Sequence, residues 1–458
     1  MLLYNQHGSK EKEPSSIRTQ RMAEHKMENE VDSLANASDK IDLSLLIQEN
    51  DVKIYTDTDD IYNIINLILE KNYSEEAFYI VDLGRVVKQY QKWKQNLPLV
   101  EPYYAVKCNS NMLLCKVLAS LGCHFDCASK TEIANIISIT KDPSRIIFAN
   151  PCKMSNQIKY ARANDVDLLT FDSDDELYKI KLYHPHAKLV LRIKVDDSKS
   201  RCKFNCKFGC GVDEVDKILM VAKVLKLDVH GVSFHVGSGC GDANQYDLAI
   251  RDCREVYDIA KSHGYTLKLL DIGGGFPGSD NGSVTFEAMS EVINLALEKY
   301  FGKKRADMAG EPESSEFDNT DDALAELRII AEPGRFMVTT SHTLVVNVIG
   351  KKEYVDESND KNFIYYLNDG VYGSFNCIYF DHAIPQIHPF NERNETHYKS
   401  KIFGPTCDSI DKIAECVMLP ELAIGEWCYI ENFGAYTTAA ASTFNGFLSP
   451  KIFYIMTT

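Results

Sequence analysis

The feature that most constrains the fold of this chain is a regular alternation of strand-like and helix-like segments. Short apolar runs begin at residues 103, 124, 146, 168, 189, 231, 269 and 328. Between them lie stretches such as "NMLLCKVLASLG" and "DKILMVAKVLKL", in which apolar residues recur at spacings of three and four. Eight β/α units in succession favour a closed (β/α)8 barrel of the TIM type over an open α/β sheet.

The pattern changes after about residue 340, where alternating strand-like segments follow one another without helices. Examples are "HTLVVNVIGKKEYV", "FIYYLNDGVYGSF" and "EWCYIENFGAY". The sequence therefore predicts a barrel over residues 81–340 and an all-β domain, of sandwich or Greek-key-like arrangement, over residues 341–458. We expect residues 41–80 to pack with this second domain.

Two polar segments interrupt this organisation. Residues 1–40 are rich in Lys, Glu, Ser and Asn, which predicts a disordered tail. Residues 303–326 are acidic and poor in aromatic residues, which predicts an exposed loop within the barrel region.

Composition bounds the class of function. A formal net charge of -16 argues against nucleic-acid binding, because neutralising phosphates requires clustered Lys and Arg. No run of about 18 apolar residues and no signal-like N-terminus is visible, so we expect a cytoplasmic protein without membrane contact.

The 14 cysteines are scattered, which favours reduced thiols. Cys202, Cys206 and Cys210 lack a fourth ligand at finger-like spacing, so no metal site is predicted.

Polar residues stand where the predicted barrel strands end. These are Lys107, Asp126, Ser129, Asn150, Asp172, Arg192, His235, the glycines 273–275, Glu332 and Arg335. Active sites of such barrels lie at the C-terminal ends of the strands. Any one of these residues could be a satisfied polar cap, and a lone lysine at a strand end usually has its ammonium in water. Together they predict a site on one rim.

The glycine run "GGGFPG" formally matches a dinucleotide-binding pattern, but Pro277 interrupts the helix that this pattern requires. Consecutive glycines also let backbone N–H groups approach a phosphate, with Arg335 supplying charge from the next strand. A phosphate beside Lys107, a lysine able to form a Schiff base, suggests pyridoxal phosphate (PLP).

Several motifs resemble the eukaryotic ornithine decarboxylases, which are fold type III PLP enzymes with a barrel of the alanine racemase type. The motifs are "PYYAVKCN", "FDCASKTEI", "FANPCK", "SFHVGSGC", "LLDIGGGFPG", "AEPGR", "NDGVYGSFNCI", "GPTCD" and "GAYTTAAASTFNGF". They occur in order over about residues 75–458. The resemblance implies decarboxylation of L-ornithine to putrescine, the first step of polyamine biosynthesis.

The resemblance also assigns residues to the cofactor. It implies that Lys107 attaches covalently to PLP, that Glu332 pairs with the pyridine nitrogen and that His235 stacks on the ring. It also implies that Ser238, Gly275, Arg335 and Tyr436 bind the phosphate, that Gly273 and Gly274 belong to the cofactor site, and that Asp126 and Arg192 organise the surroundings. Lys107 must lose its proton to act, and we expect burial beside other cations to favour this loss.

The substrate residues come from the second domain. The resemblance implies that Asp381 and Asp408 receive the distal ammonium, that Cys407 donates a proton after decarboxylation, and that Tyr372 and Phe444 line the pocket. It further implies that these groups come from the partner subunit of a homodimer. Antizyme is a possible further partner.

Two alternatives remain open. One is a catalytically inactive regulator of the antizyme-inhibitor type, although such relatives lose several of the groups that are present together here. The other is a related decarboxylase acting on lysine, arginine or diaminopimelate. Phe380 and Ser409 depart from the family pattern beside the substrate acids, so the preference between ornithine and lysine is open.

Overall fold

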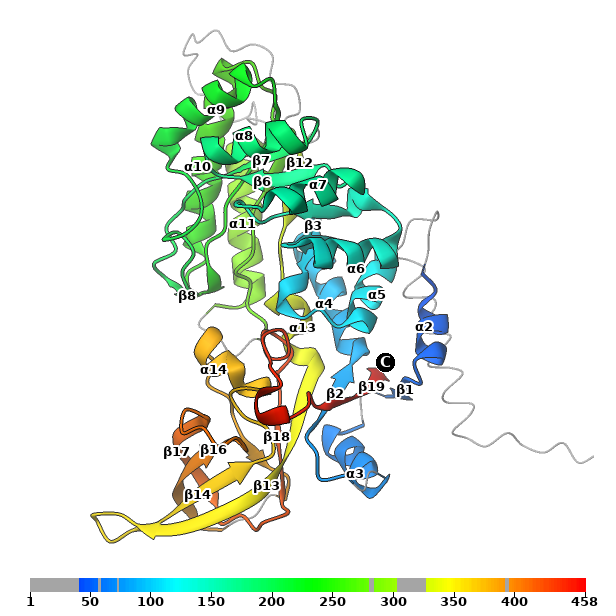
Figure 1. The fold of residues 1–458 in the computed structure, drawn as a ribbon, viewed down its shortest axis with the longest axis vertical. Helices are drawn as coiled ribbons and strands as arrows, with labels where there is room; N and C mark the ends of the chain where they lie inside the picture. Colours follow the sequence, from blue (N-terminus) through cyan, green and yellow to red (C-terminus); the bar gives the residue numbers. More distant parts are fainter. Residues whose placement is uncertain (1–40, 57–58, 72–73, 280–283, 303–326, 392–394) are drawn as a thin grey trace, which may run out of the picture.

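The computed structural model describes residues 41–56, 59–71, 74–279, 284–302, 327–391 and 395–458. The predicted tail at 1–40 and acidic loop at 303–326 lie outside the described residues. Figure 1 shows a barrel surrounded by helices at one end of the molecule and a twisted sheet at the other. Within the described residues, no helix is long and apolar enough to cross a membrane.

The predicted barrel is confirmed. Its parallel strands close in the order β11-β12-β3-β4-β5-β6-β7-β9. The strands are β3 (Val100–Ala105), β4 (His124–Cys127), β5 (Ile146–Phe148), β6 (Leu168–Phe171), β7 (Lys188–Arg192), β9 (Asp228–Ser233), β11 (Leu269–Asp271) and β12 (Arg328–Ala331). A buried cluster inside the barrel consists of the alternate strand residues Tyr103, Ile147, Leu168, Val190, Leu269 and Ile330, together with Ala149 directly after β5.

Helices surround this barrel and are held by their caps and apolar faces. They are α4 (Leu83–Asn96), α5 (Met112–Ser120), α6 (Lys130–Thr140), α7 (Ser155–Ala163), α8 (Asp174–Tyr183), α9 (Val215–Val224), α10 (Asn244–Ser262), α11 (Phe286–Phe301) and the short α13 (Arg335–Val338). Helix α5 illustrates the local cause, because the Asn111 side chain accepts hydrogen bonds from Leu113 N and Leu114 N at its start. A small antiparallel pair, β8 (Ser200–Cys202) with β10 (Ser238–Cys240), lies outside the barrel ring.

The predicted β-rich region is a nine-stranded mixed sheet in the order β1-β19-β2-β13-β14-β16-β17, with β18 pairing β13 and β15. Its strands are β1 (Lys53–Tyr55), β2 (Phe78–Asp82), β13 (His342–Val355), β14 (Lys361–Leu367), β15 (His388–Pro389), β16 (His397–Phe403), β17 (Lys412–Pro420), β18 (Trp427–Ile430) and β19 (Lys451–Thr457). The last strand, β19, lies between the first two and runs parallel to both.

Three helices accompany the sheet and the N-terminal segment, namely α2 (Leu43–Glu49), α3 (Ile61–Lys71) and α14 (Cys377–Phe380). Ile64 and Ile65 of α3 share a buried cluster with Phe78, Val345 and Phe390. Helix α2 contributes Leu43, Leu46 and Ile47 to the main core. Residues 41–80 therefore contact both the sheet and the main core.

One buried ion pair supports the helical layer around the barrel. Lys153 Nζ lies 2.9 Å from Glu176 Oε1, and their side chains are 0% and 2% exposed. Lys153 also donates to the Thr170 and Asn150 carbonyls, and Lys179 contacts the other Glu176 oxygen at 2.5 Å. Burial lowers the pKa of Lys153, and Glu176 offsets part of this effect.

We expect Glu176→Gln to destabilise the protein by roughly 3–5 kcal/mol, because it leaves the buried Lys153 ammonium without its counter-ion. Denaturant unfolding followed by circular dichroism measures the change. The matched control is Glu291→Gln on the exposed face of α11, with an expected effect within about 0.5 kcal/mol. Equal stability of the two variants would contradict this role for the pair.

Candidate active site

The C-terminal ends of the barrel strands bring Lys107, Asp126 and Glu332 into one neighbourhood. Lys107 lies in the short helical turn Val106–Cys108 that directly follows β3, and Asp126 lies in the adjacent strand β4. Lys107 Nζ donates a hydrogen bond to Asp126 Oδ2, which also forms an ion pair with it. The Asp126 side chain is fully buried, whereas that of Lys107 is 42% exposed and lies among densely packed protein atoms. The arrangement thus gives a reachable amine a buried acidic partner.

The charge state of Lys107 differs from the sequence-based expectation. Burial disfavours the ammonium, but the nearby carboxylates of Asp126 and Glu332 outweigh this effect and raise the pKa of Lys107 above its ordinary value. The expectation that neighbouring cations would favour the loss of the proton is therefore wrong for this structure. Lys107 holds its proton here because its closest charged neighbours are acids.

His235 follows β9 and faces the glycine run. Its Nδ1 accepts a hydrogen bond from Gly237 N at 3.0 Å, so the neutral ring carries its proton on Nε2. Burial, with Arg192 and Lys107 nearby, lowers the pKa of His235 well below its ordinary value. A Cβ on Gly274 would lie 2.8 Å from His235 Nε2. A neutral imidazole therefore packs directly against backbone at this rim.

A basic corner lies beside the glycine run. Arg335, the first residue of α13, donates from Nη2 to Ser238 Oγ at 3.0 Å and lies 5.1 Å above the ring of Tyr436. Gly275 has φ +121°, and a Cβ there would lie 2.7 Å from the Gly237 carbonyl, so only glycine fits. Within the described residues, Arg335 Nε has no hydrogen-bond partner although it is buried. This corner can receive an anionic group.

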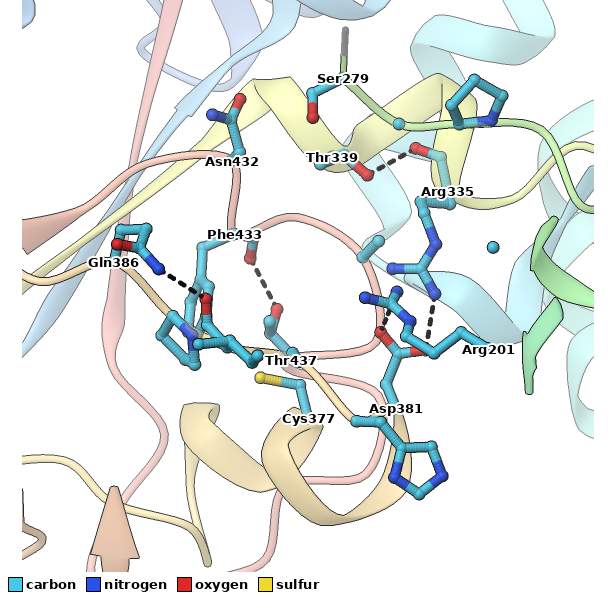
Figure 2. Close-up of a pocket in the computed structure, with 18 of the residues that line it drawn as sticks. Arg201, Ser279, Arg335, Thr339, Cys377, Asp381, Gln386, Asn432, Phe433 and Thr437 are labelled. Atoms are coloured by element: carbon cyan, nitrogen blue, oxygen red, sulfur yellow. Dashed lines mark hydrogen bonds and ion pairs between the residues drawn. The ribbon is translucent and has the colours of Figure 1, made fainter. Parts of the chain in front are cut away.

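Figure 2 shows the pocket of about 690 Å³ that adjoins this corner, between the barrel and the sheet. Arg335 and Asp381 lie at its edge, and Arg201, Thr339, Cys377, Phe433 and Thr437 also line it. Lys107, Asp126 and Glu332 are not among its lining residues. The pocket is therefore an approach to the basic corner and does not contain the lysine.

The placement of Asp381 corrects one expectation. Asp381 follows α14 and is 4% exposed, and its carboxylate accepts from Arg335 at 2.6 Å and from Arg201 at 3.2 Å within the same chain (Figure 2). The expectation that Asp381 is contributed by the partner subunit is thus wrong, because the tertiary fold brings α14 against the barrel's own basic corner.

The remaining substrate candidates form a separate cluster. Tyr372 donates to Asp408 Oδ2 at 2.5 Å and stacks on Phe444 with ring centroids 4.2 Å apart. Cys407 is exposed, and its Sγ donates to Asn445 Oδ1 at 3.3 Å. A hydrogen bond from Ile410 N and one from Tyr372 lower the pKa of Asp408, so its carboxylate is charged at neutral pH. Among the described residues, no hydrogen bond or ion pair joins this cluster to Lys107.

Arg192 influences the site through the electrostatic effect of its guanidinium on nearby carboxyl groups. It ends β7 with its guanidinium 5.1 Å above the Phe208 ring. Burial raises the pKa values of Asp271 and Glu332, and the charge of Arg192 opposes this rise. The sequence analysis did not select Asp271 or Arg201. Asp271 ends a predicted barrel strand in "LLDIGGG", so its position at the rim was a usable signal. No comparable signal in the sequence pointed to Arg201, because β8 lies outside the alternating pattern of strands and helices.

These groups lie in the part of the chain that matches a known family. The family model described as "Pyridoxal-dependent decarboxylase, pyridoxal binding domain" matches residues 83–339, which include Lys107, His235 and Arg335. The chain belongs to the pyridoxal-dependent decarboxylase family.

Curated relatives of this decarboxylase include ornithine decarboxylase of Mus musculus, which is 48% identical over 395 residues and covers 83% of this chain and 81% of that protein. Antizyme inhibitor 2 of Xenopus laevis is 47% identical over 423 residues, 90% of this chain and 88% of that protein. Among solved structures, the arginine decarboxylase of Paramecium bursaria Chlorella virus matches with a TM-score of 0.77 and 36% identity, covering 86% of this chain and all of that one.

The residues of this decarboxylase fit pyridoxal phosphate, the cofactor of the family. Lys107 supplies a reachable amine, and the basic corner of Ser238 and Arg335 carries an unpartnered, buried guanidinium nitrogen. The backbone at Gly275 leaves room that a side chain would fill. Asp126 Oδ1 is also buried without a hydrogen-bond partner in the described part of the chain. These are the features that a phosphate and a polar aromatic ring would satisfy.

Proposed function

We propose that this chain decarboxylates L-ornithine to putrescine and CO2 with pyridoxal phosphate, and that it acts in the cytoplasm as the first step of polyamine biosynthesis. The observation that carries the proposal is the pairing of Lys107 with the buried Asp126, in a chain 48% identical to an ornithine decarboxylase. When bound, the cofactor supplies an electron sink for the bond that breaks on loss of CO2.

The chain's own residues divide the remaining tasks. Lys107 provides the amine for covalent attachment, and Asp126 is placed to accept and return its proton. Glu332 would hold the pyridine nitrogen, and the neutral His235 ring would pack against the cofactor. Arg335, with Ser238, Tyr436 and the glycine backbone, would bind the phosphate. Arg192 adjusts the charge balance of the surrounding carboxyl groups.

The substrate-binding part of the proposed active site requires a second copy of the chain. Cys407 and Asp408 are solvent-accessible and lie in a cluster without bonds to Lys107 among the described residues, whereas Asp381 lies at the chain's own basic corner. A homodimer in which one copy presents Cys407, Asp408 and Phe444 to the Lys107 of the other would complete the site. Large exposed apolar side chains near this cluster, Phe380 at 71% and Leu448 at 85%, fit an interface.

A panel of amino acids tests the proposal directly. Purified protein supplied with pyridoxal phosphate should release CO2 from ornithine faster than from lysine, arginine or diaminopimelate. A higher kcat/KM for one of the other three would assign the chain to that substrate. Size-exclusion chromatography with light scattering tests the dimer, and fractionation of cells tests the location.

The resemblance to Antizyme inhibitor 2 supports a second candidate, a regulator without activity that binds antizyme. The presence of Lys107, Asp126, Arg192, Tyr372, Asp381 and Cys407 together favours an enzyme. Absence of CO2 release from all four amino acids, combined with binding to antizyme, would favour the regulator.

We expect Asp408→Ala to raise the KM for ornithine roughly 10- to 100-fold, because the distal ammonium loses a charged hydrogen-bond partner. Asp408→Asn, which keeps the contact with Tyr372 but not the charge, should raise it less. Steady-state kinetics with ornithine measures both values. An unchanged KM in the alanine variant would place the ammonium elsewhere.

A further inference from the structure

Three carboxyl groups converge inside the barrel near Lys107. Fully ionised, they would carry more negative charge than the nearby cations can balance. Asp126 and Asp271 are 0% exposed and Glu332 is 9% exposed. The cations that act on these groups are Lys107 and Arg192. Three anions against two cations leave one uncompensated negative charge in a buried site, which is costly unless one carboxyl group is protonated.

The geometry at Asp271 indicates where this proton lies. Asp271 ends β11, and its Oδ1 accepts a hydrogen bond from Gly273 N at 2.9 Å. Asp271 pairs with Ile330 of β12, and Glu332 lies two residues beyond Ile330, so the two carboxyl groups lie on the same face of neighbouring strands. Its Oδ2 is buried and, among the described residues, has no donor. Two carboxylates cannot bond to each other without a proton, and one proton between them satisfies the unpartnered oxygen.

We propose that Asp271 and Glu332 share one proton, and that Asp271 is thereby a positioning residue that holds the Glu332 carboxyl group in place. The backbone on both sides is fixed, because Glu332 N donates to the Gly273 carbonyl at 2.7 Å and β11 pairs with β12. Asp271 is therefore anchored through Oδ1 by the glycine run, which leaves the unpartnered Oδ2 as the oxygen available for the shared proton.

The electrostatic surroundings agree with this arrangement. Burial raises the pKa of Asp271 to about 7, and burial with Asp271 and Asp126 nearby raises the pKa of Glu332 well above its ordinary value. Arg192 opposes both shifts without cancelling them, and Lys107 opposes that of Glu332. The other titratable groups that feel Asp271 are the Tyr103 hydroxyl of β3 and the Cys253 thiol of α10, and both have raised pKa values and are neutral at pH 7. The pair titrates as a unit.

Infrared spectroscopy of the full-length protein tests the shared proton. At pH 6 the spectrum of the wild type minus that of Asp271→Asn should show the carbonyl band of a protonated carboxylic acid, shifted in D2O. The contribution of Asp369, whose pKa burial raises to about 6, cancels in this difference. Asp228→Asn, an exposed aspartate at the start of the neighbouring strand β9, is the matched control and should keep the band. A difference spectrum without the band would overturn the proposal. If that variant does not fold, Glu332→Gln carries the same test, since it also leaves no shared proton.

The free energy of unfolding gives a second readout. The folded chain retains this proton up to about pH 7, whereas an unfolded aspartate releases it near 3.8. The folded state thus binds more protons in this window, so this pair makes stability fall as pH rises from about 4 to about 7. Between pH 4 and pH 7 the slope of stability against pH should therefore be more positive in Asp271→Asn than in wild type. Identical slopes would count against the shared proton.

The effect on the cofactor rests on the proposed function. If Glu332 holds the pyridine nitrogen, Asp271→Asn should weaken the binding of pyridoxal phosphate roughly tenfold, because the carboxyl group loses its fixed orientation. Equilibrium titration of cofactor-depleted protein measures the Kd. An unchanged Kd with the infrared band lost would overturn the positioning role only. A chain that binds no pyridoxal phosphate would contradict the proposed function, while the infrared and stability tests would still decide the shared proton.

Discussion

The Lys107→Ala variant is expected to lose the absorbance of covalently bound cofactor and to decarboxylate ornithine roughly a thousandfold or more slowly than wild type. The loss is expected because, among the residues that the structure describes, Lys107 is the amine that pairs with the buried Asp126 and lies beside Glu332. Absorbance spectra of protein with pyridoxal phosphate, together with CO2 release, measure both losses.

Lys107→Arg is the matched variant, since arginine keeps the ion pair with Asp126 but does not give up its proton. It should be as inactive as Lys107→Ala and more stable, because the buried carboxylate retains a counter-ion. Lys223→Ala, on an exposed position of α9, should behave like wild type. Wild-type activity in either Lys107 variant would end the proposed role of this residue.

Mixing Lys107→Ala chains with Cys407→Ala chains, neither of which should form putrescine alone, should restore putrescine formation. If Lys107 acts from one subunit and Cys407 from the other, a dimer of one Lys107→Ala chain and one Cys407→Ala chain contains one doubly damaged site and one intact site. With random exchange, roughly half the dimers are mixed and each has one working site of two, so recovery approaches roughly a quarter of wild type. Tagged chains isolated as mixed dimers allow the activity to be measured per dimer.

The control mixes Lys107→Ala with Asp126→Ala. Both residues lie in one chain's barrel, so each mixed dimer has one lesion in each site and none is intact. Activity should stay at the level of the parents. No recovery in the first mixture, once exchange is verified, would place Lys107 and Cys407 in a single chain's site. Recovery in the control would contradict the assignment of Lys107 and Asp126 to the same chain's site.

The barrel could be predicted because its signal is local. Each strand is an apolar run followed by an amphipathic helix, and the residues that end the strands share one rim whatever the details of packing. Lys107, Asp126 and Glu332 could therefore be selected together from the sequence alone. The structure adds the direct bond between the first two.

Asp381, Lys107 and Asp271 show where the sequence is insufficient. The pairing of Asp381 with Arg335 depends on how α14 packs against the barrel, and no spacing encodes that contact. The charge state of Lys107 depends on the balance between burial and two acids from distant segments. Asp271 ends a predicted strand and could have been selected, but its place beside Glu332 follows only from the pairing of β11 with β12.

Strand β19 has a consequence for how the chain is made. It lies between β1 and β2, and Thr457 N donates to Asp82 Oδ1 while the Thr457 backbone fills the space beside Gly84. A ribosome that has just finished Asp82 must add 368 further residues (450 - 82) before Lys451, the first residue of β19, is made. At about 5–20 residues per second this takes on the order of tens of seconds. Throughout that time one edge of β2 has no native partner, and an open strand edge is what recruits foreign strands. The nascent chain therefore depends on protection of that edge during synthesis.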